Sequence, residues 1–408
     1  MAASLKSRLA RLKERSGAGE TPTLRPAPSG SVSAGPPAFL TGWEGIADFV
    51  YRRRLFFPFV LPERFDPRPF VARLDRGLLR GASGASSESH TEAATRDLRF
   101  FDFETTGLSG GAGTIAFLSA MGRFEEGGLS VEQLFLADYP GEAAFVRSFV
   151  ESLGEAPILV SYNGASFDWP LIRSRSVMNG LARPEATLHI DLLRSARRLW
   201  RPIVGSASLG DLEGPVLGKA RGEDIGGGEI PSVYFSFLER GDDERLALVL
   251  NHNAEDVSSL AALFAKARNL FAEPGLLASP GEVDLFNLGR ILRSCGRETE
   301  AESILWRAAE GGDARAALLL ARLLRRASRG AEASTALALA GDGFEASIEA
   351  ARIAEHVAGD LGAALDAAMA AEGKARNEEE RRRAQARERR LSLKVSGASR
   401  GRPGRTRS

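Results

Sequence analysis

Apolar runs separated by glycine-rich polar stretches organise the first half of the chain. Such runs predict three consecutive strands, at 98–104, 114–124 and 129–138, with a glycine turn at 109–113 between the first two. Three strands in a row, with short connections, favour an antiparallel meander.

The pattern then changes from consecutive strands to alternating helices and strands. A helix at 141–153 leads into a buried strand at 156–163, and a helix at 167–179 leads into a short strand at 188–193. A switch to βαβ order indicates a mixed α/β sheet. A long periodic segment at 242–271, with acidic residues in its first turn and basic residues late, predicts a further helix.

Upstream of this α/β domain, assigned to 96–272, we expect a leading arm at 39–95. Its segment 39–62 mixes aromatic and β-branched residues with Arg52, Arg53 and Arg54, which predicts a strand that augments or covers the domain. The three arginines either face a phosphate backbone or belong to an ordinary charged surface strand. Residues 1–38 are expected to be a disordered basic segment and linker, with a short amphipathic helix at 4–15.

Beyond Pro280 the composition turns to Ala, Leu, Arg and Glu at helical spacing. Arg290, Arg322 and Arg352 mark a self-similar pattern, spaced by 32 and then 30 residues. This period is close to that of tetratricopeptide repeats, although the usual aromatic positions are mostly absent. It predicts a small α-solenoid over 281–373. After Lys374 the charge density indicates a helix or coil, and we expect residues 374–408 to form a charged, basic, disordered tail.

Composition limits the function classes. The 54 basic and 53 acidic residues leave a formal charge of +1, so any contact with a polyanion depends on locally clustered charge. The single cysteine, Cys295, allows neither an internal disulfide nor a thiolate zinc site, which fits a reducing cytoplasm. No segment approaches the roughly 20 apolar residues needed to cross a bilayer. We expect a soluble cytoplasmic protein without a membrane partner.

Candidate chemistry begins at Asp102 and Glu104, two apart on a predicted strand and hence on one face. Alone, the pair could be two solvated strand acids. The strand is apolar, however, through Leu98, Phe100 and Phe101. An unpaired carboxylate is costly there, and a metal ion commonly compensates it.

Two further blocks carry acids. Asp168 follows the buried strand that ends at Asn163, where α/β sheets bind ligands, although helix capping by Ser166 or Asp168 is an alternative. His252 and Asp256 lie four apart on one helical face, which could also be an ordinary surface pair.

Together the blocks supply four carboxylates and one imidazole. Two Mg²⁺ or Mn²⁺ ions about 4 Å apart, held by oxygen ligands, stabilise the attacking and leaving oxygens in phosphodiester hydrolysis. A histidine, with a reference pKa of about 6.5, can orient and deprotonate the attacking water. His252 is the candidate for that role.

The ordered motifs D-x-E-T-x-G-L, N-G-x-x-F-D and H-N-x-x-D-V resemble those of the DEDD exonuclease superfamily. Within it, the His-Asn pair, the upstream segments 208–213 and 229–241 and the arm resemble a YprB-like subgroup; the likeness covers roughly 43–270. It implies an α/β fold with an RNase H-like mixed sheet flanked by helices, and 3′–5′ exonuclease activity on nucleic acid. DNA and RNA both remain possible substrates.

The resemblance also implies residue roles. Asp102, Glu104, Asp168 and Asp256 fall on the superfamily's metal ligands. The best-known branches have a histidine five residues before the last Asp or a tyrosine four before it, whereas this chain has Asn251 and His252 there. Residues expected to approach the substrate complete the site: Thr106, Gly107, Leu108 and Asn163.

Other interpretations stay open. The domain could be a catalytically idle nucleic-acid-binding module, or the helical repeats could make the protein an adaptor for a protein partner. The glycine turn at 109–113 lacks the ending of a phosphate-binding loop and is expected to be a hairpin turn. His189 and Asp191 could join the metal site, but a buried strand-end histidine and a capping aspartate are the favoured interpretation.

Overall fold

A computed structural model describes residues 40–71, 93–107, 113–220, 222, 224–241 and 244–400. The helix expected at 4–15, Leu108 and most of the glycine turn at 109–113 lie outside these residues. Among the described helices, none combines the length and apolar character that a membrane span requires.

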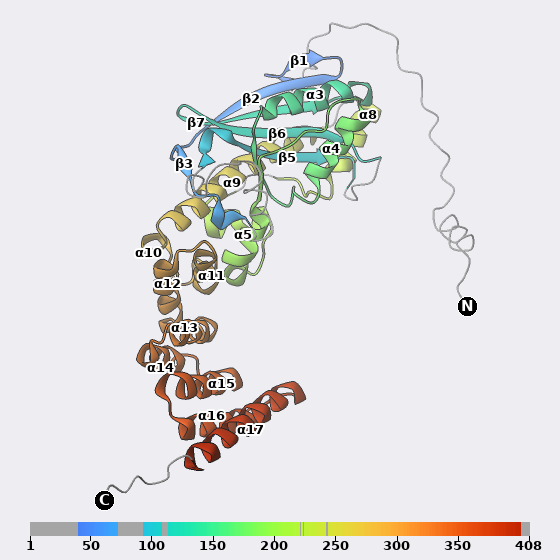
Figure 1. The fold of residues 1–408 in the computed structure, drawn as a ribbon. Helices are drawn as coiled ribbons and strands as arrows, with labels where there is room; N and C mark the ends of the chain where they lie inside the picture. Colours follow the sequence, from blue (N-terminus) through green and yellow to red (C-terminus); the bar gives the residue numbers. More distant parts are fainter. Residues whose placement is uncertain are drawn as a thin grey trace, which may run out of the picture.

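A seven-stranded mixed sheet forms the centre of the first domain, in the order β1-β2-β7-β6-β5-β8-β9 (Figure 1). The strands are β1 (Glu44–Ala47), β2 (Val50–Pro58), β5 (Leu98–Thr105), β6 (Ala116–Glu125), β7 (Gly128–Leu136), β8 (Ile158–Ser161) and β9 (Leu188–Asp191). Strands β5, β6 and β7 are antiparallel neighbours, while β5, β8 and β9 are parallel. The predicted meander and the mixed sheet are both confirmed.

The leading arm extends this sheet. Strand β2 pairs antiparallel with β7 along its whole length, from Val50 opposite Leu136 to Pro58 opposite Gly128. The three consecutive arginines of β2 have partners inside the chain: Arg52 pairs with Glu44, Arg53 with Gln133 and Arg54 with Glu132. The predicted strand is confirmed, and these contacts favour the charged-strand interpretation over phosphate binding.

Alternation along β5 divides its side chains between two cores. Leu98 and Phe100 pack on the side of α9 (Leu246–Ala272), in a cluster with Val257 and Phe264. Helices of the opposite face are α3 (Glu142–Leu153), α4 (Asp168–Met178) and α8 (Ile230–Arg240). Phe101 and Phe103 pack on this side, against α3 and α4. Asp102 and Glu104 therefore continue the face that Leu98 and Phe100 begin.

Short elements connect these layers. They are β3 (Arg64–Phe65), η2 (Arg68–Phe70), β4 (Ala93–Ala94), η3 (Thr95–Asp97), η4 (Tyr139–Gly141), α5 (Leu192–Leu199), α6 (Arg201–Val204), α7 (Leu209–Leu212), η5 (Glu213–Leu217) and α10 (Pro274–Leu277).

Three helical hairpins follow and extend away from the sheet (Figure 1). Their helices are α11 (Leu285–Ser294), α12 (Glu298–Glu310), α13 (Ala314–Arg326), α14 (Gly330–Ala338), α15 (Phe344–Ile353), which continues as η6 (Ala354–Ala358), and α16 (Leu361–Gly373). Arg290, Arg322 and Arg352 lie on the first helix of each successive hairpin. The helical repeat is thus present, and its kinship with tetratricopeptide repeats stays a prediction.

The prediction of a disordered tail from residue 374 is wrong over most of its length. Residues Glu378–Arg400 form helix α17, which packs against α16. Two apolar residues, Ala384 and Leu391, are fully buried, and Arg387 and Arg390 pair with Glu355 of the preceding hairpin. Charge density alone predicts a solvated coil. In the structure, arginines of this segment form ion pairs with Glu355 of the preceding hairpin, and these pairs stabilise the helix.

Candidate active site

A cavity of 190 Å³ opens at the carboxyl end of β5. Its lining comes from β5, from the loop after β8 with the start of α4, and from the start of α8. The lining residues are Asp102, Phe103, Glu104, Thr105, Tyr162, Asn163, Phe167, Asp168, Gly227 and Pro231. Three of the four predicted carboxylates therefore line one cavity.

The carboxyl groups of Asp102 and Glu104 are largely shielded from solvent. Burial raises the pKa of Asp102 well above its ordinary value, and the charges of Asp256 and Asp168 raise it further. Burial is likewise the main cause of the raised pKa of Glu104, followed by the charge of Asp102. Like charges close together disfavour ionisation of each carboxyl group. All four predicted carboxylates thus belong to one electrostatic cluster.

Asp168 is the first residue of α4, and burial raises its pKa to about 7. Phe167 occupies the N-cap position, and no side chain caps the helix. The capping alternative for Ser166 and Asp168 is therefore wrong. Gly164 lies directly behind the carboxylate, since a Cβ atom added there would meet Oδ2 of Asp168 at 2.8 Å.

His252 and Asp256 approach this cluster from α9. Nε2 of His252 lies 3.6 Å from Oδ2 of Asp256 and 3.9 Å from Oε1 of Glu104. The other ring nitrogen, Nδ1, lies 2.6 Å from Oδ1 of Asp224. A carboxylate at Nδ1 fixes the orientation of the ring and directs Nε2 toward the carboxylates.

A series of hydrogen bonds between buried polar side chains, the polar chain, holds Asp102 in place. Nδ2 of Asn253 donates to Oδ2 of Asp102 at 3.0 Å, and Nε2 of Gln133 donates to Oδ1 of Asn253 at 2.9 Å. Arg53 of the leading arm donates from Nε to Oε1 of Gln133 at 2.6 Å. Asn253 and Gln133 are both completely buried. The arm therefore reaches a site carboxylate through two amide side chains.

Four of these contributors were not predicted as part of the site: Arg53, Gln133, Asp224 and Asn253. Asn253 stands inside the His-Asn motif, and its position next to His252 was the available signal. Gln133 is a polar residue on a strand that is buried along almost its whole length, Gln133 included. Asp224 lies in a glycine-rich loop without periodicity, and the sequence carries no signal for it.

The predicted substrate-binding residues have different placements. Asn163 lines the cavity with a φ of 67°, a left-handed conformation that asparagine tolerates better than most residues. Thr106 accepts a hydrogen bond from the Ile115 amide, and the Gly107 carbonyl accepts one from Thr105, so both residues shape the start of the turn beside the cavity. Leu108 lies outside the described residues.

His189 and Asp191 have structural roles, as favoured from the sequence. Asp191 caps α5 by accepting from the Leu193 amide, and it also accepts from the Asn163 amide. His189 is partly buried, with Nε2 2.8 Å from Oγ of Ser161. Asp191 thereby fixes the loop that carries Asn163.

The donor set suits hard divalent cations, because clustered carboxylate oxygens are the ligands that Mg²⁺ and Mn²⁺ prefer. Among the described residues, neither Lys nor Arg forms an ion pair with Asp102, Glu104 or Asp168. No three acidic, histidine or cysteine side chains in the described part of the chain already form a coordinating group. The fit therefore rests on donor chemistry, burial and mutual repulsion, which a divalent cation would relieve.

Part of the chain is similar to known proteins. Residues 99–268 match the RNase H superfamily, and this segment, with its mixed sheet and flanking helices, is an RNase H-like domain. The uncharacterized protein YprB of Bacillus subtilis (strain 168) is 40% identical to the chain over 185 residues. That alignment covers 44% of this chain and 45% of YprB, so the chain matches less than half of its relative's length. Over that part the chain is YprB-like.

One solved structure shows structural similarity to part of the chain. The family B DNA polymerase of the hyperthermophilic archaeon Pyrobaculum calidifontis is similar at a TM-score of 0.34 and 17% identity, over 52% of this chain and 29% of the polymerase chain.

Proposed function

We propose that the protein is a metal-dependent 3′–5′ exonuclease that hydrolyses phosphodiester bonds of DNA or RNA by a two-metal-ion mechanism. One observation carries the proposal: four carboxylates from three separate segments of an RNase H-like domain form one electrostatic cluster, and three of them line one cavity. Burial raises the pKa values of Asp102, Glu104 and Asp168, and the charges of the other cluster members raise those of Asp102 and Glu104 further. Such a cluster costs stability, and retaining it is expected where the carboxylates bind cations.

Each residue has a proposed role. Asp102, Glu104, Asp168 and Asp256 would hold two Mg²⁺ or Mn²⁺ ions, which when bound would stabilise charge on the attacking and leaving oxygens. His252, oriented by Asp224, accepts the proton of the attacking water at Nε2. Asn253 holds one oxygen of Asp102 in a fixed direction.

We propose that Thr106, Gly107, Leu108 and Asn163 position the terminal nucleotide. Thr106 and Gly107 directly follow β5, and Asn163 lies in the loop after β8. A nucleic-acid 3′ end is the proposed partner, and the helical hairpins are the proposed site for a protein partner. A cytoplasmic location fits a chain that contains one cysteine and no disulfide.

The test uses the full chain with Mn²⁺ or Mg²⁺ and end-labelled single- and double-stranded DNA and RNA. We expect shortening from the 3′ end that stops with EDTA and in the Asp102→Ala, Glu104→Ala variant. A matched control removes two exposed acids of the β6–β7 hairpin, Glu125→Ala with Glu126→Ala, and should keep full activity. Nucleic-acid binding without metal-dependent shortening would overturn the proposal and favour an idle binding module.

A further inference from the structure

A second cavity lies between α15 and α17, away from the carboxylate cluster. It has a volume of 350 Å³ and is lined by Ile348, Arg352, Arg383, Ala386, Arg387 and Arg390. Four of its six lining residues are arginines, and none is acidic. We call these four residues, Arg352, Arg383, Arg387 and Arg390, the arginine cleft.

The arrangement follows from helical geometry. Arg383, Arg387 and Arg390 are spaced four and three residues apart, so they share one face of α17. Arg352 reaches the same cavity from α15. The two small or apolar lining residues, Ala386 and Ile348, leave room between the guanidinium groups.

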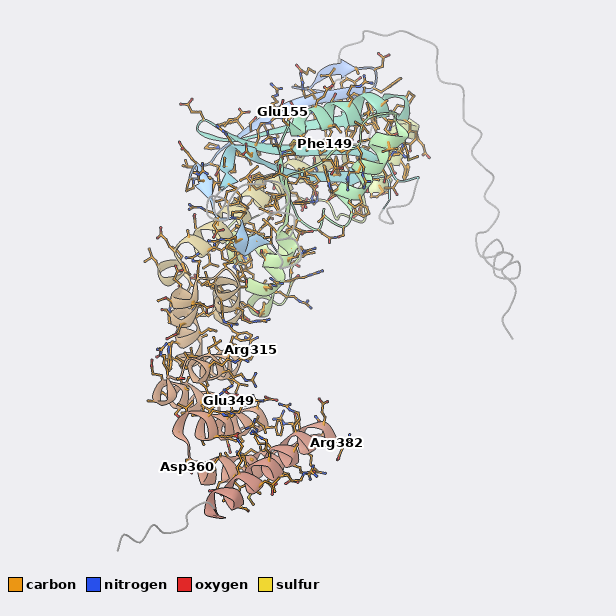
Figure 2. All side chains as sticks on the ribbon, in the orientation of Figure 1. Phe149, Glu155, Arg315, Glu349, Asp360 and Arg382 are labelled. Atoms are coloured by element: carbon orange, nitrogen blue, oxygen red, sulfur yellow. The ribbon has the colours of Figure 1, made fainter. Side chains whose placement is uncertain are left out.

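Acidic neighbours do not balance this charge. The cleft arginines form ion pairs with three carboxylates, Glu345, Glu349 and Glu355. Among the described residues, seven arginine and lysine side chains pair with these three. These seven are Arg322, Arg325, Arg352, Arg383, Arg387, Arg390 and Lys394. Figure 2 marks Glu349 on the hairpin side and Arg382 on α17. Positive charge therefore remains in excess around the cleft.

The close spacing of the positive charges affects the pKa of Arg387, whose side chain is 16% exposed. Its pKa is lowered by burial and then by the positive charges of Arg352 and Arg390. An anion placed among these groups would relieve that repulsion.

From the cavity, its arginine lining and the excess of cations over carboxylates among the ion pairs of the described residues around it, we infer that the arginine cleft binds backbone phosphates of a nucleic acid. Planar guanidinium groups bind phosphate oxygens in pairs. Residues 383 to 390 span about 10 Å of helix, over which one strand of a duplex carries about three phosphates. The inference rests on the proposed function, because it makes the bound strand a part of the nuclease substrate distant from the cleaved end.

Binding is measured without cleavage, by fluorescence anisotropy of labelled single- and double-stranded oligonucleotides in EDTA with the full chain. The Arg383→Ala, Arg390→Ala variant should bind about ten-fold more weakly, and the slope of log affinity against log salt should fall by about two. The matched control, Arg382→Ala with Arg389→Ala, removes equal charge from exposed positions of α17 outside the cleft. It should change affinity less than two-fold.

Equal losses in both double variants, or none in either, would overturn the inference. Circular dichroism checks that α17 stays helical, and Arg383→Lys with Arg390→Lys should recover the salt slope but only part of the affinity. Polyglutamate that displaces the oligonucleotide at equal charge concentration would point to an acidic protein partner and also overturn it. Cleft-dependent binding by a chain that cleaves nothing would uphold the inference while the proposed nuclease activity fails.

Discussion

Asp224 and His252 lie 2.6 Å apart, joined through Oδ1 and Nδ1, although 28 residues separate them in the chain. The pair links the loop before α8 to the second turn of α9, on the face that points to the site. Because Asp224 holds one nitrogen, the ring directs the other toward Glu104 and Asp256. The proposed proton acceptor, His252, thus depends on a loop residue for its direction.

We expect Asp224→Ala to lower kcat on oligonucleotides about ten-fold with little change in KM, since the imidazole stays but loses its orientation. His252→Ala should cost more, about 10²–10⁴-fold, as general-base losses do. The double variant should be no slower than His252→Ala, because both substitutions remove the same function. Independent, multiplying losses in steady-state rates would contradict the pairing, and Asp224→Asn should restore part of the rate.

Gly164 sets the position of Asp168. A Cβ atom at residue 164 would meet Cβ and Oγ of Ser161 at 2.7 Å and the Asp168 carboxylate at 2.8 Å. Gly164→Ala should therefore displace this carboxylate and lower the cleavage rate at least ten-fold, because small displacements at a reacting centre are costly. Gly210→Ala, with open space around the added carbon, is the control and should retain its rate. Calorimetric titration with Mn²⁺ should show weaker binding in Gly164→Ala alone.

Much of this architecture was predictable, for physical reasons. The strands from β5 to β7 are predictable because each is an apolar run, and helix α9 is predictable because its apolar positions are periodic. The order of the three carboxylate blocks predicts the candidate site. Helix α17 was not predictable, since its apolar contacts are few and its arginines depend on Glu355, distant in the sequence. The role of Asp224 in the site was not predictable for a similar reason, because only tertiary packing brings its loop to His252.

Gln133 connects the arm to the site and should be important for stability. Gln133→Leu removes the donor to Asn253 and the acceptor for Arg53, leaving buried polar groups unsatisfied at a cost of about 1–3 kcal/mol each. We expect a lower free energy of unfolding in urea and slower cleavage, because Asn253 then holds Asp102 less firmly. The same replacement at Gln385, a partly buried residue of α17 that donates to Glu372, should cost less than about 1 kcal/mol. Equal effects at the two positions would argue against the polar chain.

Glu349 should be the most sensitive carboxylate of the helical hairpins. It is fully buried and pairs with Arg322, Arg325 and Arg352, so Glu349→Ala leaves buried positive charge uncompensated. A loss of about 3–5 kcal/mol in the free energy of unfolding is expected. Glu345→Ala, at a side chain 38% exposed, should cost no more than about 1 kcal/mol. Urea denaturation followed by circular dichroism at 222 nm compares the two, and similar losses would contradict this account.

His189 should make the fold sensitive to acid. Burial lowers its pKa to about 4, whereas an unfolded chain binds that proton at about 6.5. Between these values the unfolded state holds more protons, so this contribution to stability is complete above about pH 6.5 and is lost as the pH falls toward 4. The His189→Gln variant should lose up to about 1.4 kcal/mol per pH unit less than the parent over this window. Urea unfolding at several pH values compares the parent with this variant, and parallel curves for the two would show that His189 does not titrate with unfolding.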